Sequence, residues 1–323
     1  MSKEAEFSAA APRILYVCSA ARCGSTILDM FFGGHPQAAS LGELNLIGKA
    51  IKLRQLCTCG SEISQCGAWG AVFDELAERG RQDFRTHPYA FGLWPARARV
   101  LVDREHQDKS FERSFKLRQA WLIGRSKLPP TARRLLPLPA VMKTALTNKI
   151  DLYNIIAKRW NRSLIVDSSK SPWEAVELVK RVPNQVKVVL LTRDGRGVYH
   201  SRRSSGFSRE ESVAGWKNYY KRALPMLMAE LGPENLLNVR YEDFARNPDS
   251  TGRNLCDWLG LPYEPRMLDL GAADRHMVNG NDTRFKPQQG IKLDERWRKE
   301  LLGDELMYFN QHGLSINGLL GYS

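Results

Sequence analysis

Three groups of residues in this sequence have the types and spacing needed to bind an anion or a metal. The first is Ser-Ala-Ala-Arg-Cys-Gly-Ser-Thr, residues 19–26, which lies between an apolar run and the apolar pattern of a helix. A loop that joins a strand to a helix start directs backbone N–H groups and the positive end of the helix dipole at one point. We therefore expect Gly24, Ser25 and Thr26 to bind an anion, with Arg22 as the nearby cation.

The same loop lacks the lysine of a nucleoside-triphosphate site. In the pattern G-x-x-x-x-G-K-[ST] the lysine reaches the β- and γ-phosphates. Here Cys23 stands in its place, and Arg22 is the only cation close by in the sequence. Hydrolysis of ATP or GTP is therefore disfavoured.

The second group is Arg193 and Ser201, eight residues apart. An apolar run ends at Arg193, a turn follows through Asp194 and Gly195, and the helix after it would place Ser201 about two turns on. A guanidinium and a hydroxyl in this relation can converge on one phosphate. Two phosphate sites at two strand-to-helix junctions fit a nucleotide that is phosphorylated at both ends.

The third group is Cys57, Cys59 and Cys66, three of the six cysteines. Three thiols this close could ligate zinc, but a structural zinc site has four ligands, and the sequence does not identify the fourth. A disulfide or redox pair and reduced thiols in a packed turn are the alternatives.

The elements that must position these residues alternate along the chain. Runs rich in β-branched residues at 14–18, 164–167, 186–192 and 236–240 predict strands, and segments with helical spacing separate most of them. A further short strand is expected to end at Gly42 and Glu43. Serines three residues before a glutamate mark two helix starts, at Ser171 and Ser208. We expect an α/β fold of the P-loop type, a three-layer domain with a central parallel sheet flanked by helices.

The length favours one domain over residues 1–323, with a mainly helical, basic insertion at about 70–162 after the second strand. Residues 95–165 hold sixteen Lys and Arg against five Asp and Glu. This segment would either hold an acidic acceptor or form a solvated surface in which long basic side chains cover apolar area.

The net charge of the whole chain favours anionic partners but does not distinguish among them. Its 48 Lys and Arg against 35 Asp and Glu give a formal net charge of +13, which favours phosphate esters, acidic glycans, nucleic acid or anionic membranes. No apolar run approaches the roughly 20 residues that cross a bilayer, and the first residues lack the apolar core of a secretory signal. We expect a cytoplasmic protein with no membrane span.

These motifs together resemble the sulfotransferases that use 3′-phosphoadenosine 5′-phosphosulfate (PAPS). Residues 19–26 are similar to their 5′-phosphosulfate loop, and Arg-Asp-Gly-Arg-Gly-Val-Tyr-His-Ser, residues 193–201, to their 3′-phosphate motif. The similarity extends through residues 168–184, 239–248 and 284–297 and covers about half of the chain. The resemblance implies PAPS as the donor, adenosine 3′,5′-bisphosphate (PAP) as the product, and no catalytic metal.

The resemblance also implies roles for single residues. Glu43 is similar in context to the glutamate base of tyrosylprotein and some carbohydrate sulfotransferases. Lys170, with Arg22, would stabilise the leaving oxygen. Nucleotide binding would fall to Arg22, Cys23, Gly24, Ser25, Thr26, Arg193, Ser201, Tyr241, Arg284 and Lys286.

Histidine is the alternative base, because cytosolic small-molecule sulfotransferases use one. His35 is the first rival to Glu43, and His87 and His106 are weaker candidates.

The acceptor is not contained in these motifs. The basic insertion and the context of Glu43 favour a carbohydrate or glycoconjugate hydroxyl, with protein tyrosine or a small alcohol as alternatives. A P-loop kinase and a nucleic-acid-binding protein are rival functions from other classes, although we expect no nucleic acid partner. The oligomeric state stays open.

Overall fold

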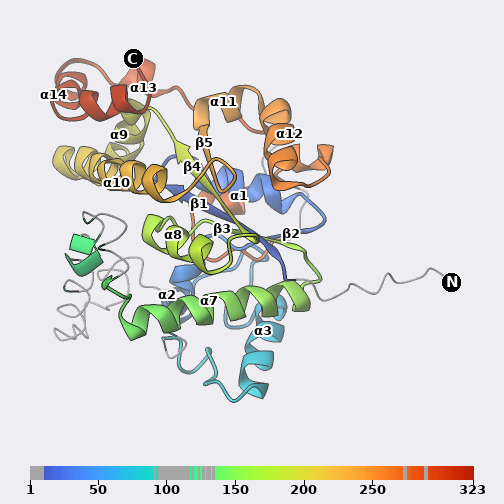
Figure 1. The fold of residues 1–323 in the computed structure, drawn as a ribbon. Helices are drawn as coiled ribbons and strands as arrows, with labels where there is room; N and C mark the ends of the chain where they lie inside the picture. The colour runs from blue at the N-terminus through green and yellow to red at the C-terminus, as the bar shows by residue number, and fades with distance from the viewer. Residues whose placement is uncertain are drawn as a thin grey trace.

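A computed structural model describes residues 11–89, 92–93, 135–271, 275–286 and 290–323, together with isolated positions between 117 and 132. Five parallel strands form one sheet in the order β2-β3-β1-β4-β5 (Figure 1). Their bounds are β1 Arg13–Ser19, β2 Ala38–Ser40, β3 Leu164–Asp167, β4 Val186–Thr192 and β5 Leu236–Arg240. The predicted α/β class and four of the predicted strands are confirmed.

The prediction for the short strand was wrong at its end. Strand β2 stops at Ser40, and Gly42 instead forms an isolated parallel bridge with Val278. Glu43 precedes the 3-10 helix η1, Leu44–Leu46. The partner of Gly42 lies far along the chain, so local patterning could not reveal that the strand is interrupted.

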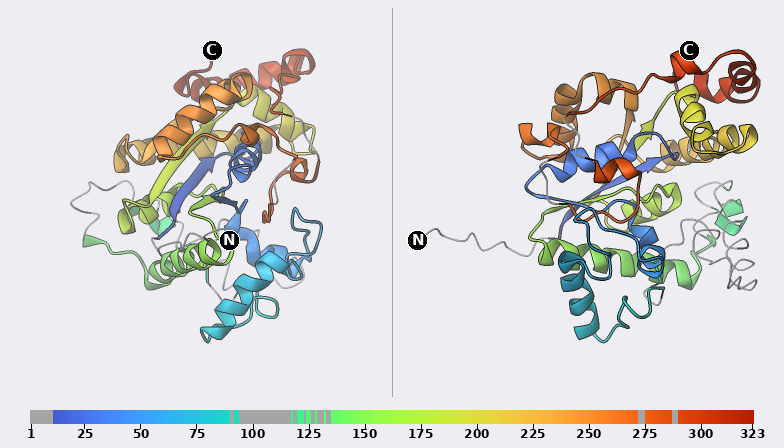
Figure 2. Two further views of the ribbon diagram at one scale, coloured as in Figure 1. Left: turned by 90° about the vertical axis from the view of Figure 1, so that its right-hand side faces the viewer. Right: turned by 180° about the vertical axis from the view of Figure 1, so that it is seen from behind.

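Helices cover both faces of the sheet, as Figures 1 and 2 show. Alternate residues of β1 point to opposite faces. Ile14, Tyr16 and Cys18 pack in a core with residues of α7, α8, α9, α10 and α14, whereas Leu15 and Val17 pack with residues of α1, α11 and α12. The helix bounds are α1 Ser25–Gly33, α2 Ile47–Lys52, α3 Gly67–Glu78, α7 Ala140–Arg159, α8 Pro172–Arg181, α9 Gly195–Arg203, α10 Arg209–Glu230, α11 Tyr241–Arg246, α12 Pro248–Leu259, α13 Trp297–Glu300 and α14 Gly303–Leu319.

Two predicted helix starts are confirmed. Ser171 caps α8, where its hydroxyl accepts from the backbone N–H of Glu174, and Ser208 forms a full capping box with Glu211 at α10. The two caps differ in one respect. The Glu174 carboxylate turns inward and accepts from Tyr16 at 2.6 Å instead of completing a box.

Helices α2, α3 and α7 follow β2 and precede β3, and of these α3 and α7 fall largely within residues 70–162, where the helical insertion is expected. Helix α7 buries Lys149, Leu152 and Ile155 within this part of the fold, so at these positions it contributes to the core rather than to a basic surface. Most of residues 94–134, which hold much of the predicted basic segment, lie outside the described residues. Among the helices that the structure describes, none is long and apolar enough to cross a membrane.

A C-terminal segment, of which residues 275–286 and 290–296 are described, returns across the rim of the sheet. In the right-hand view of Figure 2 its orange-red part lies beside α1. It includes the 3-10 helix η3, Asp282–Phe285, and the residues that lead to α13. This segment supplies one wall of the site described below.

Candidate functional site at the strand rim

The carboxyl ends of all five strands open onto one cleft of about 1100 Å³. This edge is where ligands bind in open α/β sheets. The lining residues, in the order of the strands across the sheet, are Glu43 after β2, Lys170 after β3, Arg22 and Gly24 to Thr26 after β1, Arg193 and Ser201 after β4, and Tyr241 after β5. Nine of the residues singled out from the sequence therefore face one space.

The loop between β1 and α1 contains two residues with positive φ, Arg22 and Gly24. Gly24 has φ of 91° and precedes the first helical residue, Ser25. A Cβ at Gly24 would lie 2.6 Å from Cδ2 of Tyr241, so this position also lacks room for a side chain. Arg22 has φ of 73° and donates from Nη2 to the Ser205 hydroxyl at 2.9 Å. The loop backbone and the start of α1 can therefore approach a ligand closely.

Cys23 points away from the cleft. It is fully buried, and the Tyr220 hydroxyl lies 3.3 Å from its sulfur. Burial raises the pKa of the Cys23 thiol to about 11, so the thiol stays protonated. Only the backbone of Cys23 remains available to the loop, and its side chain supplies no charge there.

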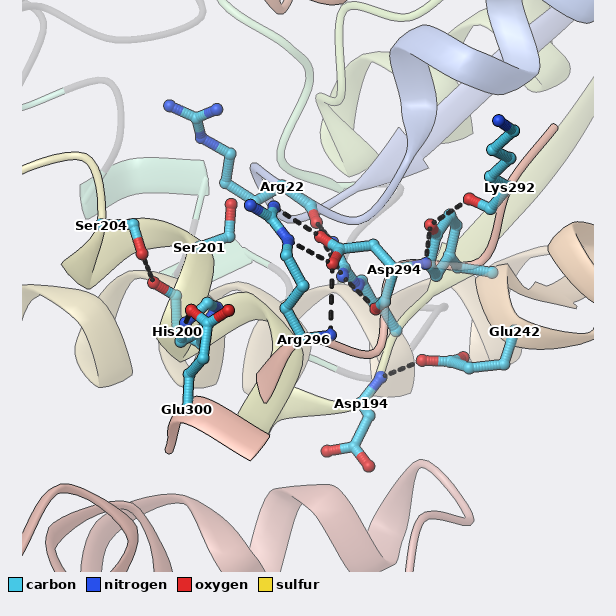
Figure 3. A network of polar contacts seen from close by, with 12 residues as sticks. Arg22, Asp194, His200, Ser201, Ser204, Glu242, Lys292, Asp294, Arg296 and Glu300 are labelled. Atoms are coloured by element: carbon cyan, nitrogen blue, oxygen red, sulfur yellow. Dashed lines mark hydrogen bonds and ion pairs between the residues drawn. The ribbon is translucent and has the colours of Figure 1, made fainter. Parts of the chain in front are cut away.

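Arg193 links the two predicted phosphate-binding turns. Arg193 is 6% exposed, and its guanidinium donates from Nη1 to the carbonyl of Arg22 at 3.0 Å. It lies over the ring of Tyr241, with 4.5 Å between Cζ and the ring centre. Nη2 contacts the Asp294 carboxylate at 3.2 Å, and Figure 3 shows Asp294 held in turn by Arg296. The Arg193 side chain is thus fixed before any ligand arrives.

Glu43 and Lys170 form an ion pair on the other side of the β1–α1 loop. Lys170 Nζ lies 2.6 Å from Glu43 Oε1, and the two side chains are 17% and 19% exposed. The backbone N–H of Glu43 donates to the Val278 carbonyl at 2.8 Å. Lys170 takes a positive φ of 64°, which directs the chain sharply into α8. A carboxylate and an ammonium are therefore presented together beside the loop.

A buried carboxyl group connects the two turns that carry this ion pair. Asp29, on α1, accepts from the Ser168 hydroxyl at 2.5 Å and from the backbone N–H of Gly42 at 3.0 Å, and it also accepts from the Ser40 hydroxyl. Burial raises its pKa to about 7. Gly42 and Ser168 precede Glu43 and Lys170 closely, so Asp29 joins the two turns that carry the ion pair.

Residues 13–265 match the pattern of the sulfotransferase family. The match covers more than half of the chain. This protein belongs to the sulfotransferase family.

One solved sulfotransferase structure shares the fold of this family member, and two others are similar to it at lower TM-scores. The sulfotransferase domain from the Synechococcus PCC 7002 olefin synthase is 19% identical with a TM-score of 0.55, and the alignment covers 97% of this chain and 96% of that one. The sulfotransferase domain from the curacin biosynthetic pathway is also 19% identical, with a TM-score of 0.49 and coverage of 97% and 98%. Sulfotransferase STF9 from Mycobacterium avium is 14% identical, with a TM-score of 0.42 and coverage of 94% and 78%. No curated protein matches this sulfotransferase.

The two rival histidines that the structure describes, His35 and His87, lie away from the cleft of this sulfotransferase. His35 follows the far end of α1, about 14 Å along the helix from the loop at 1.5 Å per residue. It is 2% exposed, its Nε2 lies 2.9 Å from the Pro262 carbonyl, and burial lowers its pKa. His87 lies outside the lining, with Nδ1 3.0 Å from the Thr86 hydroxyl. His106 lies outside the described residues.

Of the three predicted nucleotide contacts nearest the C-terminus, only Tyr241 lines the cleft. Its hydroxyl donates to the Lys292 carbonyl at 3.2 Å and accepts from the N–H of Asp294 at 3.0 Å. Arg284 is 8% exposed and outside the lining, with Cζ 4.5 Å from the centre of the Phe285 ring. Lys286 is exposed and is not among the lining residues either.

Sequence reasoning found the C-terminal segment, but the two residues it named there, Arg284 and Lys286, are not among those that line the cleft. The side of the cleft formed by this segment is lined by Gly280, Asn281, Asp282, Thr283, Gly290, Lys292, Leu293, Asp294, Glu295 and Arg296. Asn281 donates from its backbone N–H to the Thr26 hydroxyl at 3.2 Å, which joins the segment to the β1–α1 loop. Ser204 and Ser205, on the turn after α9, were also missed. The only available signal for them was their place one turn beyond Ser201.

Proposed function

We propose that this sulfotransferase transfers the sulfuryl group of PAPS to an acceptor hydroxyl and releases PAP. The observation that carries the proposal is the order of groups along the rim of the sheet. The ion pair of Glu43 and Lys170 lies on the β2–β3 side, the β1–α1 loop lies in the middle, and Arg193 with Ser201 lies on the β4 side.

This order suits a donor that carries an anionic group at each end. In our proposal the 5′-phosphosulfate lies on the loop, where backbone N–H groups, Ser25 and Thr26 contact it. The 3′-phosphate lies on Arg193 and Ser201, and Tyr241 borders the same side of the cleft. A donor held in this way directs its sulfuryl group towards Lys170 and Glu43.

The reaction then needs one base and one cationic group. Glu43 takes the proton of the acceptor hydroxyl as the acceptor oxygen bonds to sulfur, and the bond between sulfur and the bridging oxygen of PAPS breaks. Lys170 and Arg22 donate to this oxygen as its charge grows. The two products are the sulfate ester and PAP.

A nucleoside triphosphate fits the loop less well. The lysine that would reach the β- and γ-phosphates is missing, and the Cys23 side chain is buried against Tyr220. Arg22 is the loop's cation, which suits a phosphosulfate whose terminal group carries a single charge. This favours sulfuryl transfer over the kinase alternative.

For the acceptor we propose a carbohydrate or glycoconjugate hydroxyl. The excess of 48 Lys and Arg over 35 Asp and Glu favours an acidic substrate. A glutamate base in the context of Glu43 resembles that of carbohydrate sulfotransferases. Preferential sulfation of protein tyrosine or of a small alcohol in an acceptor screen would replace the carbohydrate assignment.

The donor assignment is tested by thermal unfolding of the full chain with PAP, with ATP and without ligand, in the absence of added metal. A ligand at 100 times its Kd stabilises a protein by about 2.7 kcal/mol, which is measurable as a rise in Tm. We expect PAP to raise Tm and ATP to have a much smaller effect. Selective stabilisation by ATP would overturn the proposal. Transfer of label from radiolabelled PAPS to a panel of glycans, tyrosine peptides and alcohols then identifies the acceptor class.

A further inference from the structure

The three clustered cysteines meet a histidine from the opposite end of the chain. The sulfurs of Cys57, Cys59 and Cys66 and a ring nitrogen of His276 all lie within 4.8 Å of one another. His276 is 210 residues beyond Cys66. It is the fourth group that the sequence alone could not identify.

The distances among these atoms suit one small tetrahedral ion. Cys59 Sγ and Cys66 Sγ are 3.6 Å apart, and His276 Nδ1 lies 3.6 Å from Cys57 Sγ and 3.3 Å from Cys66 Sγ. Around zinc, bonds of about 2.3 Å to sulfur and about 2.0 Å to nitrogen place neighbouring ligand atoms roughly 3.5–3.8 Å apart. A disulfide needs about 2.05 Å between sulfurs, and all six cysteines are free.

The local backbone is built to present the three thiols. The N–H of Cys57 donates to the Ser61 carbonyl at 2.8 Å, and the N–H of Gly60 donates to the Cys57 carbonyl at 3.0 Å. Gly60 takes φ of 90°, which closes this tight turn. Cys66 occupies the residue position just before the first turn of α3. The thiols thus come from one turn and one helix start.

Residues close to these cysteines in the sequence hold His276 in place by hydrogen bonds to the backbone around it. The indole N–H of Trp69 donates to the His276 carbonyl at 2.9 Å. The Thr58 hydroxyl donates to the Arg275 carbonyl and accepts from the N–H of Met277 at 3.1 Å. The ring of Trp160 packs against the imidazole with 5.4 Å between ring centres. The imidazole position is therefore set by packing and hydrogen bonds on both sides.

The geometry points to a structural zinc site made of Cys57, Cys59, Cys66 and His276. Three thiolates and a neutral imidazole form a closed coordination shell, as in structural rather than catalytic zinc sites. None of the four residues lines the cleft.

The site would fix the segment that completes the cleft. Two residues after His276, Val278 donates its N–H to the Leu41 carbonyl at 2.8 Å and accepts from the N–H of Glu43 at 2.8 Å. Three residues further, Asn281 contacts the Thr26 hydroxyl. Zinc would thus anchor the chain that supports both Glu43 and the β1–α1 loop, without taking part in the chemistry.

The test is the metal content of the full chain purified under reducing conditions without chelator, followed by titration with zinc and with cobalt. We expect one zinc per chain by elemental analysis and the visible bands of tetrahedral, thiolate-bound cobalt after exchange. Cys59→Ser is the informative variant, because Cys59 is exposed and its loss leaves the buried core intact. It should remain folded by circular dichroism and bind zinc about 10-fold or more weakly in chelator competition, by analogy with changes around other metal ligands.

Cys256→Ser is the matched control, because Cys256 is a free, buried cysteine in the other core and its sulfur lies 4.0 Å from that of Met267. It should keep full zinc affinity. The proposal fails if the wild-type chain takes up no zinc when the metal is added in equimolar amount. It also fails if Cys59→Ser and His276→Gln bind zinc as tightly as the wild type. These readouts do not depend on sulfuryl transfer.

Discussion

Glu43 and Lys170 form an ion pair 2.6 Å long, although 127 residues separate them in the chain. They meet because β2 and β3 are neighbours in the sheet and both turns are tied to Asp29. In the proposed reaction this pair places a proton acceptor and a cationic donor on the same side of the sulfuryl group.

Glu43→Gln should abolish most turnover while leaving PAP binding intact. The amide keeps the shape of the side chain but cannot take a proton, and a positioned base contributes about 10²–10⁴-fold to rate. We expect a fall of roughly 100-fold or more, measured with radiolabelled PAPS and a saturating acceptor.

Glu177→Gln is the matched control for this prediction. Glu177 forms an ion pair with Arg125 at 3.0 Å with similar exposure, 13% and 14%, but lies outside the cleft. Its turnover should stay at the wild-type level. Normal turnover by Glu43→Gln would remove Glu43 as the base.

Arg193→Ala should remove the thermal stabilisation by PAP. Arg193 contributes the only charged group that we assign to the 3′-phosphate, and hydrogen bonds to charged groups contribute about 1.5–3 kcal/mol each. We expect PAP affinity to fall at least 10-fold by isothermal calorimetry.

Arg253→Ala controls for the loss of a guanidinium stacked on tyrosine. Arg253 lies over Tyr263 at 4.3 Å, much as Arg193 lies over Tyr241, but it is on the surface of α12. PAP should bind Arg253→Ala as it binds the wild type. Equal affinity of PAP for the Arg193→Ala variant would contradict the proposed orientation of the nucleotide.

Much of the fold could be predicted because its strands are buried on both faces. Residues 186–192 form a nearly continuous apolar run, which is what a central parallel strand requires. The position of the turns after these strands could also be predicted, because parallel strands bring their carboxyl ends to one edge of the sheet. Arg22, Lys170 and Arg193 thus share one cleft, as the order of motifs suggested.

The remaining features depend on contacts between distant segments. His276 meets Cys66, Asp294 meets Arg193, and Val278 meets Gly42 only because the C-terminal segment crosses the rim. Neither hydrophobic periodicity nor a helix-capping residue in the sequence predicts the path of the C-terminal segment. The end of β2 and the contact of His276 with the cysteine cluster could therefore not be predicted from spacing alone.

Lys149→Met should destabilise the protein by about 3–5 kcal/mol, because it leaves buried carboxylates uncompensated. Lys149 is fully buried on α7 and lies 2.8 Å from Asp167 and 3.5 Å from Glu174. The free energy of unfolding from urea titration measures the effect.

Lys158→Met provides a control on the same helix. The Lys158 side chain is 70% exposed and lies 3.4 Å from Glu75. Without Lys158 the buried Glu75 carboxylate still keeps its ion pairs with Arg79 and Arg159, so this variant should unfold almost as the wild type does. Equal effects of the two substitutions would show that Lys149 is not needed to balance the buried carboxylates.

Asp29 should make the protein less stable as the pH rises from about 4 to about 7. Its pKa is about 7 in the folded chain because of burial, against an ordinary value of 3.8. In this window the unfolded chain has lost the proton that the folded chain still holds, so the free energy of unfolding falls with rising pH. The three-unit difference corresponds to at most about 4 kcal/mol. Below and above the window this residue contributes no slope.

Asp29→Asn removes this titration, so the difference in unfolding free energy between wild type and variant should change steadily between pH 4 and pH 7 and then level off. Asp249→Asn is the control, because Asp249 is exposed and its pKa is lowered by Arg253, which places its titration below this window. Parallel stability curves for the wild type and Asp29→Asn across this range would mean that the Asp29 carboxyl is already ionised at pH 4. The hydrogen bonds from Ser40, Gly42 and Ser168 would then outweigh the cost of burying its charge.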